Sequence, residues 1–159
     1  MAQEIERRFL VDDRIWHQQG RAQARTATRI RQGFLSTVKE RVVRVRQAGE
    51  QATLTIKGIT RGIAKQEFEY AIPLADAQTM LEQLCLPPLI DKIRYQVEVA
   101  GLLWEVDEFA GLNQGLILAE VELISEEQAV VLPAWIAREV SDDPRYFNSS
   151  LISKPFSTW

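Results

Sequence analysis

The feature that most constrains this chain is a period-2 alternation of charged and apolar side chains that recurs along its length. Seven segments carry it clearly: residues 4–11, 40–47, 51–57, 65–72, 91–99, 103–109 and 116–124. Because successive side chains of a strand point to opposite faces, each segment is expected to be a β-strand with one charged and one apolar face. Residues 28–35 form a weaker candidate for an eighth strand.

The charged faces mostly gather side chains of one sign. Like charges stand two residues apart in Glu4 and Glu6, Arg44 and Arg46, Glu67 and Glu69, Lys92 and Arg94, Glu105 and Asp107, and Glu120 and Glu122. Like charges on one face repel, so a solvated face, the alternative for any single strand, normally mixes signs. The repetition favours a closed barrel whose charges point inward, where acidic and basic strands face one another. An open sheet with helices on one face is the runner-up.

Helical patterns are fewer. Apolar residues recur at helical spacing in residues 74–84, and a short helix capped by an aspartate is expected over residues 12–19. Residues 125–128 have the form of a capping box that opens a helix, and another helix is expected over residues 133–138. The predicted fold class is α+β, mainly β: a closed eight-stranded antiparallel β-barrel, open as a tunnel, with a few peripheral helices. One domain is expected over residues 1–159.

A charged interior of this kind suits a short, strongly anionic ligand. Arginine forks and lysine ammonium groups match the oxygens of a phosphate chain. Six cations are candidates for binding it: Arg8, Arg44, Arg46, Lys57, Lys92 and Arg94. The sequence therefore predicts a site for a triphosphate or a longer polyphosphate.

The carboxylates cannot bind phosphate directly, but they can hold Mg²⁺ or Mn²⁺, which prefer oxygen ligands and bridge to phosphates. Glu4 and Glu6 lie about 6.7 Å apart along their strand, so their side chains can converge on one ion. Glu120 or Glu122 would complete its coordination. The further tunnel carboxylates are Glu67, Glu69, Glu105 and Asp107.

Other kinds of function find no support in the sequence. It contains no glycine-rich phosphate loop, no dinucleotide-binding turn and no nucleophile-elbow serine. His17 is the single histidine, expected in a surface helix, and a net charge of −3 argues against a general nucleic-acid binder. No apolar run is long enough to span a membrane. Cys85 is the single cysteine, which excludes an internal disulfide and fits a cytoplasmic protein.

At its N-terminus the chain resembles the CYTH superfamily, the triphosphate tunnel metalloenzymes. The segment Glu4-Ile5-Glu6-Arg7-Arg8 resembles the Glu-x-Glu-x-Lys signature, and Gln32-Gly33-Phe34-Leu35 resembles the motif Gln-Gly-Tyr-Leu. The remaining family motifs follow in order: Arg44-Val45-Arg46, Leu54-Thr55-Ile56-Lys57-Gly58, Glu67-Phe68-Glu69-Tyr70, Asp91-Lys92-Ile93-Arg94-Tyr95, Trp104-Glu105-Val106-Asp107-Glu108-Phe109, Ala119-Glu120-Val121-Glu122-Leu123 and Glu139-Val140-Ser141, then Asp143, Arg145-Tyr146 and Asn148.

This resemblance implies metal-dependent hydrolysis of inorganic triphosphate to pyrophosphate and phosphate, as in small bacterial members of the family. Glu4, Glu6, Glu120 and Glu122 would be the metal-binding and catalytic carboxylates, and the six cations would bind phosphate. An enzyme acting on nucleoside or thiamine triphosphate, an adenylate cyclase, and a non-catalytic polyphosphate or nucleotide binder remain alternatives. The protein would be a monomer or homodimer without nucleic-acid or membrane partners.

Two positions depart from the family motifs. Arg8 stands where the family has lysine, and Phe34 stands where it has tyrosine. Since arginine stays protonated at any working pH, Arg8 is expected to supply a permanent charge rather than to act as a base.

Overall fold

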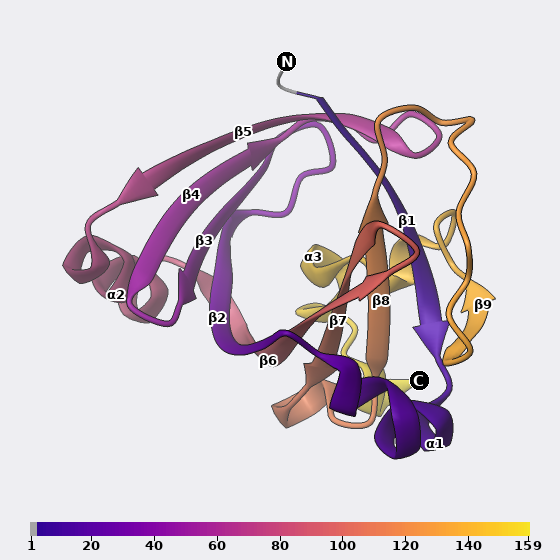
Figure 1. Ribbon diagram of the computed structural model, residues 1–159. Coiled ribbons are helices and arrows are strands. Elements are labelled where there is room, and N and C mark those ends of the chain that lie inside the picture. The colour runs from indigo at the N-terminus through magenta and orange to yellow at the C-terminus, as the bar shows by residue number, and fades with distance from the viewer. Residues whose placement is uncertain (1–2) are drawn as a thin grey trace.

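The computed structural model describes residues 3–159, which form one sheet and a few short helices (Figure 1). The strands are β1 (Gln3–Val11), β2 (Thr26–Ser36), β3 (Val42–Ala48), β4 (Gln51–Lys57), β5 (Ala64–Ile72), β6 (Leu86–Val99), β7 (Leu102–Phe109), β8 (Ile117–Glu122) and β9 (Ile136–Glu139). All eight strands that the alternation predicted are present, and β2 and β6 begin earlier than predicted.

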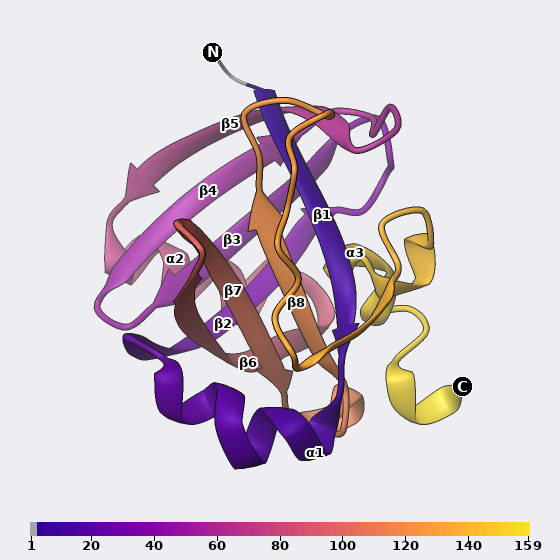
Figure 2. The same ribbon diagram turned by 45° about the vertical axis from the view of Figure 1, so that its right-hand side comes forward.

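The sheet closes into a barrel. Its strands follow the order β5-β4-β3-β2-β6-β7-β8-β1-β9, and an additional pairing of β5 with β1 joins the ends. β1 divides one edge between two partners, since its first residues pair with β5 and its last residues pair with β9. Eight antiparallel strands therefore form a closed barrel with β9 outside it, which confirms the predicted fold class (Figures 1 and 2).

Two hairpin turns set the register of the neighbouring strands. Gly49 and Glu50 connect β3 to β4, with Ala48 opposite Gln51. Ala100 and Gly101 connect β6 to β7, and their φ angles are +51° and +80°. Positive φ at both central residues is the geometry of the type I′ turn, whose twist matches that of the strands it joins. Ala100, although not a glycine, has a positive φ because both favoured two-residue turns, types I′ and II′, require it at the first central position.

The largest apolar cluster lies outside the barrel, on the outward faces of β1, β6, β7 and β8. Trp16, Trp104 and Trp135 are fully or almost fully buried there, with ring centroids 5.2 Å apart for Trp16–Trp135 and 5.8 Å for Trp104–Trp135. Trp16 comes from the N-terminal helical segment, made of α1 (Asp13–Ile15), a π-helical turn (Trp16–Gly20) and a 3₁₀ turn (Arg21–Gln23). This segment confirms the helix predicted over residues 12–19, and the Asp12 side chain caps it.

Two further apolar clusters complete the packing. The helix α2 (Leu74–Gln83) covers the outer face of β3 and β4 through Ala77 and Leu81, as its apolar spacing predicted. At one end of the barrel, inward-facing Leu118 and Ile90 pack with Leu151 of the C-terminal helix α3 (Asn148–Leu151). The short 3₁₀ turns are Gly111–Asn113, Pro144–Tyr146 and Phe156–Thr158.

The helix predicted from the capping box at residues 125–128 is wrong. These residues form a turn, in which the Gln128 backbone N–H donates to the Ser125 carbonyl at 3.3 Å. The Gln128 side-chain oxygen accepts from the backbone N–H of Ile124 at 2.7 Å. The capping-box side chain is therefore used within the turn and does not begin a helix. Val130 then packs against the tryptophan cluster, which draws the chain into an extended path.

The helix predicted over residues 133–138 is also wrong. A turn at Ala134 and Trp135 leads into β9, which pairs with the end of β1. The Trp135 carbonyl accepts from the backbone N–H of Asp12 at 2.8 Å, and the Trp135 ring is buried among the other tryptophans. Burial of this ring and the free edge of β1 therefore override the local helical preference.

Within residues 3–159, no helix has the length and apolar character needed to cross a membrane. The location in the cell, the oligomeric state and the extent of a single domain stay predictions.

Candidate active site

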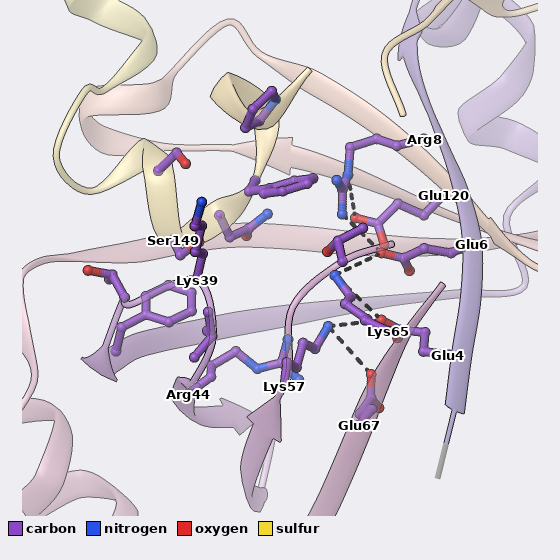
Figure 3. Close-up of a pocket in the computed structure, with 18 of the residues that line it drawn as sticks. Glu4, Glu6, Arg8, Lys39, Arg44, Lys57, Lys65, Glu67, Glu120 and Ser149 are labelled. Atoms are coloured by element: carbon purple, nitrogen blue, oxygen red, sulfur yellow. Dashed lines mark hydrogen bonds and ion pairs between the residues drawn. The ribbon is translucent and has the colours of Figure 1, made fainter. Parts of the chain in front are cut away.

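The inside of the barrel contains a cavity of about 700 Å³, which is lined by residues of the strands, of the β2–β3 and β4–β5 loops and of the C-terminal segment (Figure 3). Thirteen of the fourteen residues singled out in the sequence line it: Glu4, Glu6, Arg8, Arg44, Arg46, Lys57, Glu67, Glu69, Lys92, Arg94, Glu105, Glu120 and Glu122. Asp107 is the exception, because it lies behind the cavity wall, where it is 1% exposed. The predicted inward register is therefore confirmed, and the residues gather at one site.

The acidic wall of the cavity consists of Glu4 and Glu6 on β1 with Glu120 and Glu122 on β8. The strand register places Glu6 opposite Glu122 and Arg8 opposite Glu120. Arg8 joins the two strands, because its Nη2 donates to Glu6 Oε1 at 3.0 Å and its Nε donates to Glu120 Oε1 at 3.2 Å.

Glu6 and Glu120 have opposite protonation tendencies. Burial, together with the charge of nearby Glu120, raises the pKa of Glu6 to about 8. Burial also acts to raise the pKa of Glu120, but Arg8 and Arg94 outweigh it and hold that pKa well below the ordinary value. Two close carboxylates in a low-dielectric site cannot both ionise freely. Ionisation of the second carboxyl group of this pair is therefore disfavoured.

Two lysines neutralise the outer part of the acidic wall. Lys57 Nζ lies 3.2 Å from Glu4 Oε1 and 3.5 Å from Glu67 Oε2. Lys65 Nζ lies 3.8 Å from Glu4 Oε1 and 3.9 Å from Glu6 Oε1. Lys65 was missing from the residues singled out in the sequence. Its position two residues before Glu67 on the same strand gives it the same inward face, so the alternation contained the signal.

On β6 and β7, a buried carboxylate binds two cations. Lys92 Nζ lies 2.7 Å from Asp107 Oδ2, and Arg94 donates from Nε and Nη2 to the two Asp107 oxygens at 2.8 and 2.9 Å. Burial acts to raise the pKa of Asp107, but the two cations lower it to about 2. Asp107 therefore acts from behind the cavity, where it holds Lys92 and Arg94 in place.

The arginines of β3 have no such partner. In the described part of the chain, no carboxylate lies within ion-pair distance of Arg44 or Arg46. Arg44 Nη2 donates to the Thr55 hydroxyl at 3.1 Å and its buried Nε has no acceptor, while Arg46 Nε donates to the Gln32 amide oxygen at 2.8 Å. Burial lowers the pKa of both guanidinium groups, and neighbouring arginines lower it further. Such uncompensated positive charge is costly unless an anion joins it.

The C-terminal segment and the loop between β2 and β3 supply residues that the sequence did not single out as site residues. Asn148 Oδ1 accepts from Gln32 Nε2 and from Lys92 Nζ, both at 2.8 Å, and the Phe147 ring lies 5.1 Å from the Arg8 guanidinium carbon. Lys39 lines the cavity from the loop between β2 and β3. Loops and short turns have no periodic pattern, so only the order of family motifs pointed to Asn148.

The donor set of the acidic wall fits a hard divalent cation, because four carboxylates on adjacent strands offer only oxygen ligands. Among residues 3–159, however, no three acidic, histidine or cysteine side chains are arranged closely enough to hold an ion. The reason lies in the contacts described above, since Glu4, Glu6 and Glu120 are bonded to lysine and arginine side chains instead. An ion would therefore have to replace some of these contacts.

The model of the CYTH domain matches residues 2–154 of the chain. The chain belongs to the CYTH family. Curated relatives include an inorganic triphosphatase of Acetivibrio thermocellus, 41% identical over 159 residues that cover all of this chain and 99% of the relative. An inorganic triphosphatase of Nitrosomonas europaea is 36% identical over 155 residues, which cover 93% of this chain and 95% of the relative.

A solved structure with a similar fold is the crystal structure of the inorganic triphosphatase NE1496. It is 33% identical to this CYTH chain, with a TM-score of 0.63, and the match covers 96% of this chain and 95% of that one.

Proposed function

We propose that this CYTH protein hydrolyses inorganic triphosphate to pyrophosphate and phosphate inside its barrel, with the help of a divalent metal ion. The observation that carries the proposal is the pair of largely buried arginines, Arg44 and Arg46, which face a carboxylate wall across the cavity without carboxylate partners of their own. A ligand that meets both walls must combine phosphate oxygens with a bridging cation. The names of the two curated relatives support this substrate.

In this proposal, Arg44 and Arg46 bind the phosphate chain, because a guanidinium can donate two parallel hydrogen bonds to phosphate oxygens. Lys92 and Arg94 continue the cationic wall, and Asp107 fixes their orientation. Binding places anionic charge next to the two arginines and removes the cost of their uncompensated burial. The unfavourable free energy of burying these two charges in the empty protein therefore contributes to substrate affinity when the substrate relieves it.

Mg²⁺ or Mn²⁺ would be held by Glu4, Glu6, Glu120 and Glu122. When bound, the metal would polarise a phosphoryl group and neutralise the charge that develops on it. Arg8 keeps its charge throughout, so its role is to position Glu6 and Glu120 rather than to accept a proton.

An organic triphosphate is the second candidate substrate. Phe34, Val42 and Ile59 line the cavity beside the cations. Inorganic triphosphate has no group that would contact such apolar side chains, whereas a nucleoside or thiamine moiety would.

The test is phosphate release from tripolyphosphate, pyrophosphate, ATP and thiamine triphosphate, each with Mg²⁺, with Mn²⁺ and with EDTA. We expect tripolyphosphate to be the preferred substrate and EDTA to abolish activity. The control is Glu120→Gln, which keeps the shape of the side chain and removes its charge. Full activity in EDTA would contradict the metal requirement, and a preference for ATP would favour the second candidate.

A further inference from the structure

Lys65 occupies an unusual position among the cavity cations, because it lies between the two carboxylates of the N-terminal signature. Figure 3 shows its side chain pointing between Glu4 and Glu6, and its Nζ is 3.8 Å from one Oε1 and 3.9 Å from the other. The register pairs Lys65 with Glu4 across β5 and β1. A positive charge is therefore held almost equally far from both carboxylates.

The contacts of Lys65 are weaker than those of its neighbours. Both of its carboxylate distances exceed hydrogen-bonding range, whereas Lys57 makes a hydrogen bond to Glu4 at 3.2 Å and is also anchored by Glu67. The remaining neighbour of Lys65 is the Phe147 ring, 5.4 Å from its Nζ. Of the two lysines, Lys65 is thus the one that can leave with the smaller loss of bonding.

When both are ionised, as a metal site requires, Glu4 and Glu6 also need a cation between them. Both are largely buried, with side chains 14% exposed, and Glu120 adds a further carboxylate next to Glu6. Buried like charges repel strongly unless a counter-ion lies close to them. Arg8 meets this need on one side of Glu6, and Lys65 meets it on the other.

We propose that Lys65 is an internal counter-ion that occupies the metal position between Glu4 and Glu6, and that a divalent cation displaces it. The proposal rests on the metal site of the proposed function and adds that Lys65 competes with the metal ion for that site. Before metal binds, the ammonium group keeps the acidic wall together. When the ion enters, Lys65 leaves both carboxylates and its charge becomes available to the phosphate chain in the same cavity. Lys65 is a positioning residue in this account.

The proposal predicts that removing the Lys65 charge strengthens metal binding. Affinity for Mn²⁺ is measured by titration calorimetry without substrate, for the wild type, Lys65→Met and Lys65→Arg. Since the Lys65 ammonium group occupies the position that the ion would take, Lys65→Met should bind Mn²⁺ at least about tenfold more tightly than the wild type. Lys65→Arg retains the charge and should stay close to the wild type.

A matched control separates local competition from the general loss of one positive charge. Lys39 also lines the cavity, and within the described chain no carboxylate pairs with it. Lys39→Met should change the affinity for Mn²⁺ by less than about twofold, because the charge lies away from the signature carboxylates and is screened. An equal gain in Lys39→Met and Lys65→Met would contradict the proposal.

The outcomes also distinguish this proposal from the proposed function. If the wild type binds Mn²⁺ and Lys65→Met binds it equally or more weakly, Lys65 does not compete and the present proposal is overturned alone. If the wild type binds neither Mn²⁺ nor Mg²⁺ and remains active in EDTA, the proposed function is overturned. Should Lys65→Met fail to fold, a crystal structure of the wild type grown with Mn²⁺ decides, because Lys65 Nζ must then have left both carboxylates.

Discussion

Two strands of the barrel carry nearly the same pair of cations in opposite electrostatic surroundings. β3 contributes Arg44 and Arg46 with a valine between them, and β6 contributes Lys92 and Arg94 with an isoleucine between them. Both pairs face the cavity and are largely removed from water. Asp107 raises the pKa of Arg94 well above its ordinary value despite burial, whereas burial and nearby arginines lower the pKa of Arg46 well below it.

The neighbouring strands cause this difference. The register of β6 with β7 places Asp107 opposite Arg94, whereas β3 lies between β2 and β4, which place Gln32 opposite Arg46 and Thr55 opposite Arg44. One pair is therefore neutralised by the fold and the other is left for a ligand. Identical local patterns can thus serve stability in one strand and binding in another.

The largest expected effect on stability comes from removing the carboxylate Asp107 from the β6 pair, which then lacks it as the β3 pair does. Asp107→Asn leaves Lys92 without its carboxylate partner and leaves Arg94 with the longer, 3.4 Å pair to Glu105. Loss of one partner from a buried ion pair typically costs about 3–5 kcal/mol. We expect the free energy of unfolding to fall by this amount in urea denaturation. Asp91→Asn, which breaks the exposed pair between Asp91 on β6 and Arg29 on β2, is the control and should cost much less. Equal losses would contradict the comparison.

The stability difference between the wild type and Asp107→Asn should also depend on pH. The pKa of Asp107 in the folded protein is about 2, below its ordinary value of 3.8. A depressed carboxyl pKa contributes stability that is present above the ordinary value and is lost as pH falls through the folded value. The part of the stability difference that comes from ionised Asp107 should therefore be fully present above about pH 4 and shrink towards pH 2. Burial lowers the pKa of Lys92 to about 7, so the comparison is made below that pH. Urea denaturation at several pH values measures it.

The next prediction concerns Arg46→Met, which should raise stability and lower activity. Arg46→Met removes an uncompensated charge and keeps an unbranched side chain, so we expect the free energy of unfolding to rise by on the order of 1 kcal/mol. Loss of a cation that stabilises transferring phosphate should lower kcat/KM for tripolyphosphate by about 100-fold. Denaturation and steady-state kinetics check the two parts. A strongly destabilised variant would show that Arg46 supports the fold.

Ligand binding should stabilise the protein through the β3 pair. At a free tripolyphosphate concentration 100 times Kd, any ligand of the native state adds about 2.7 kcal/mol, which raises Tm. We expect this shift in the wild type with Mg²⁺. At the same concentration the shift should be smaller in Arg46→Met, because the variant binds the ligand less tightly. An unchanged Tm in the wild type would argue against a preformed binding site.

The smallest effect is expected at Arg8, which differs from both pairs because it joins carboxylates. Arg8→Lys keeps the charge, but one ammonium group cannot reproduce the bonds that two separate nitrogens make to Glu6 and Glu120. We expect kcat/KM to fall by about threefold to tenfold, roughly 0.7–1.4 kcal/mol. Arg8→Ala loses the charge as well and should fall further. Equal losses in the two variants would show that the geometry of the fork is what matters.

Much of the barrel and of the site could be predicted because the alternation of a strand is a local property. A side chain at i+2 shares the face of residue i whatever the strand pairs with, so like charges such as Glu120 and Glu122 mark one face. The same rule would have placed Lys65 beside Glu67. It could not foresee Lys39 or Asn148, which reach the cavity from a loop and a short C-terminal helix without periodicity.

The helices expected at residues 125–128 and 133–138 failed for a tertiary reason, since burial of Trp135 and the free edge of β1 outweigh weak local preferences. Tertiary structure also decided what each cation does. By itself, the sequence determined that Arg44, Arg46, Lys92 and Arg94 point into a barrel. Which of them meets a carboxylate depends on the order and register of strands that are distant in the chain. The alternation within one strand does not specify which strands lie beside it.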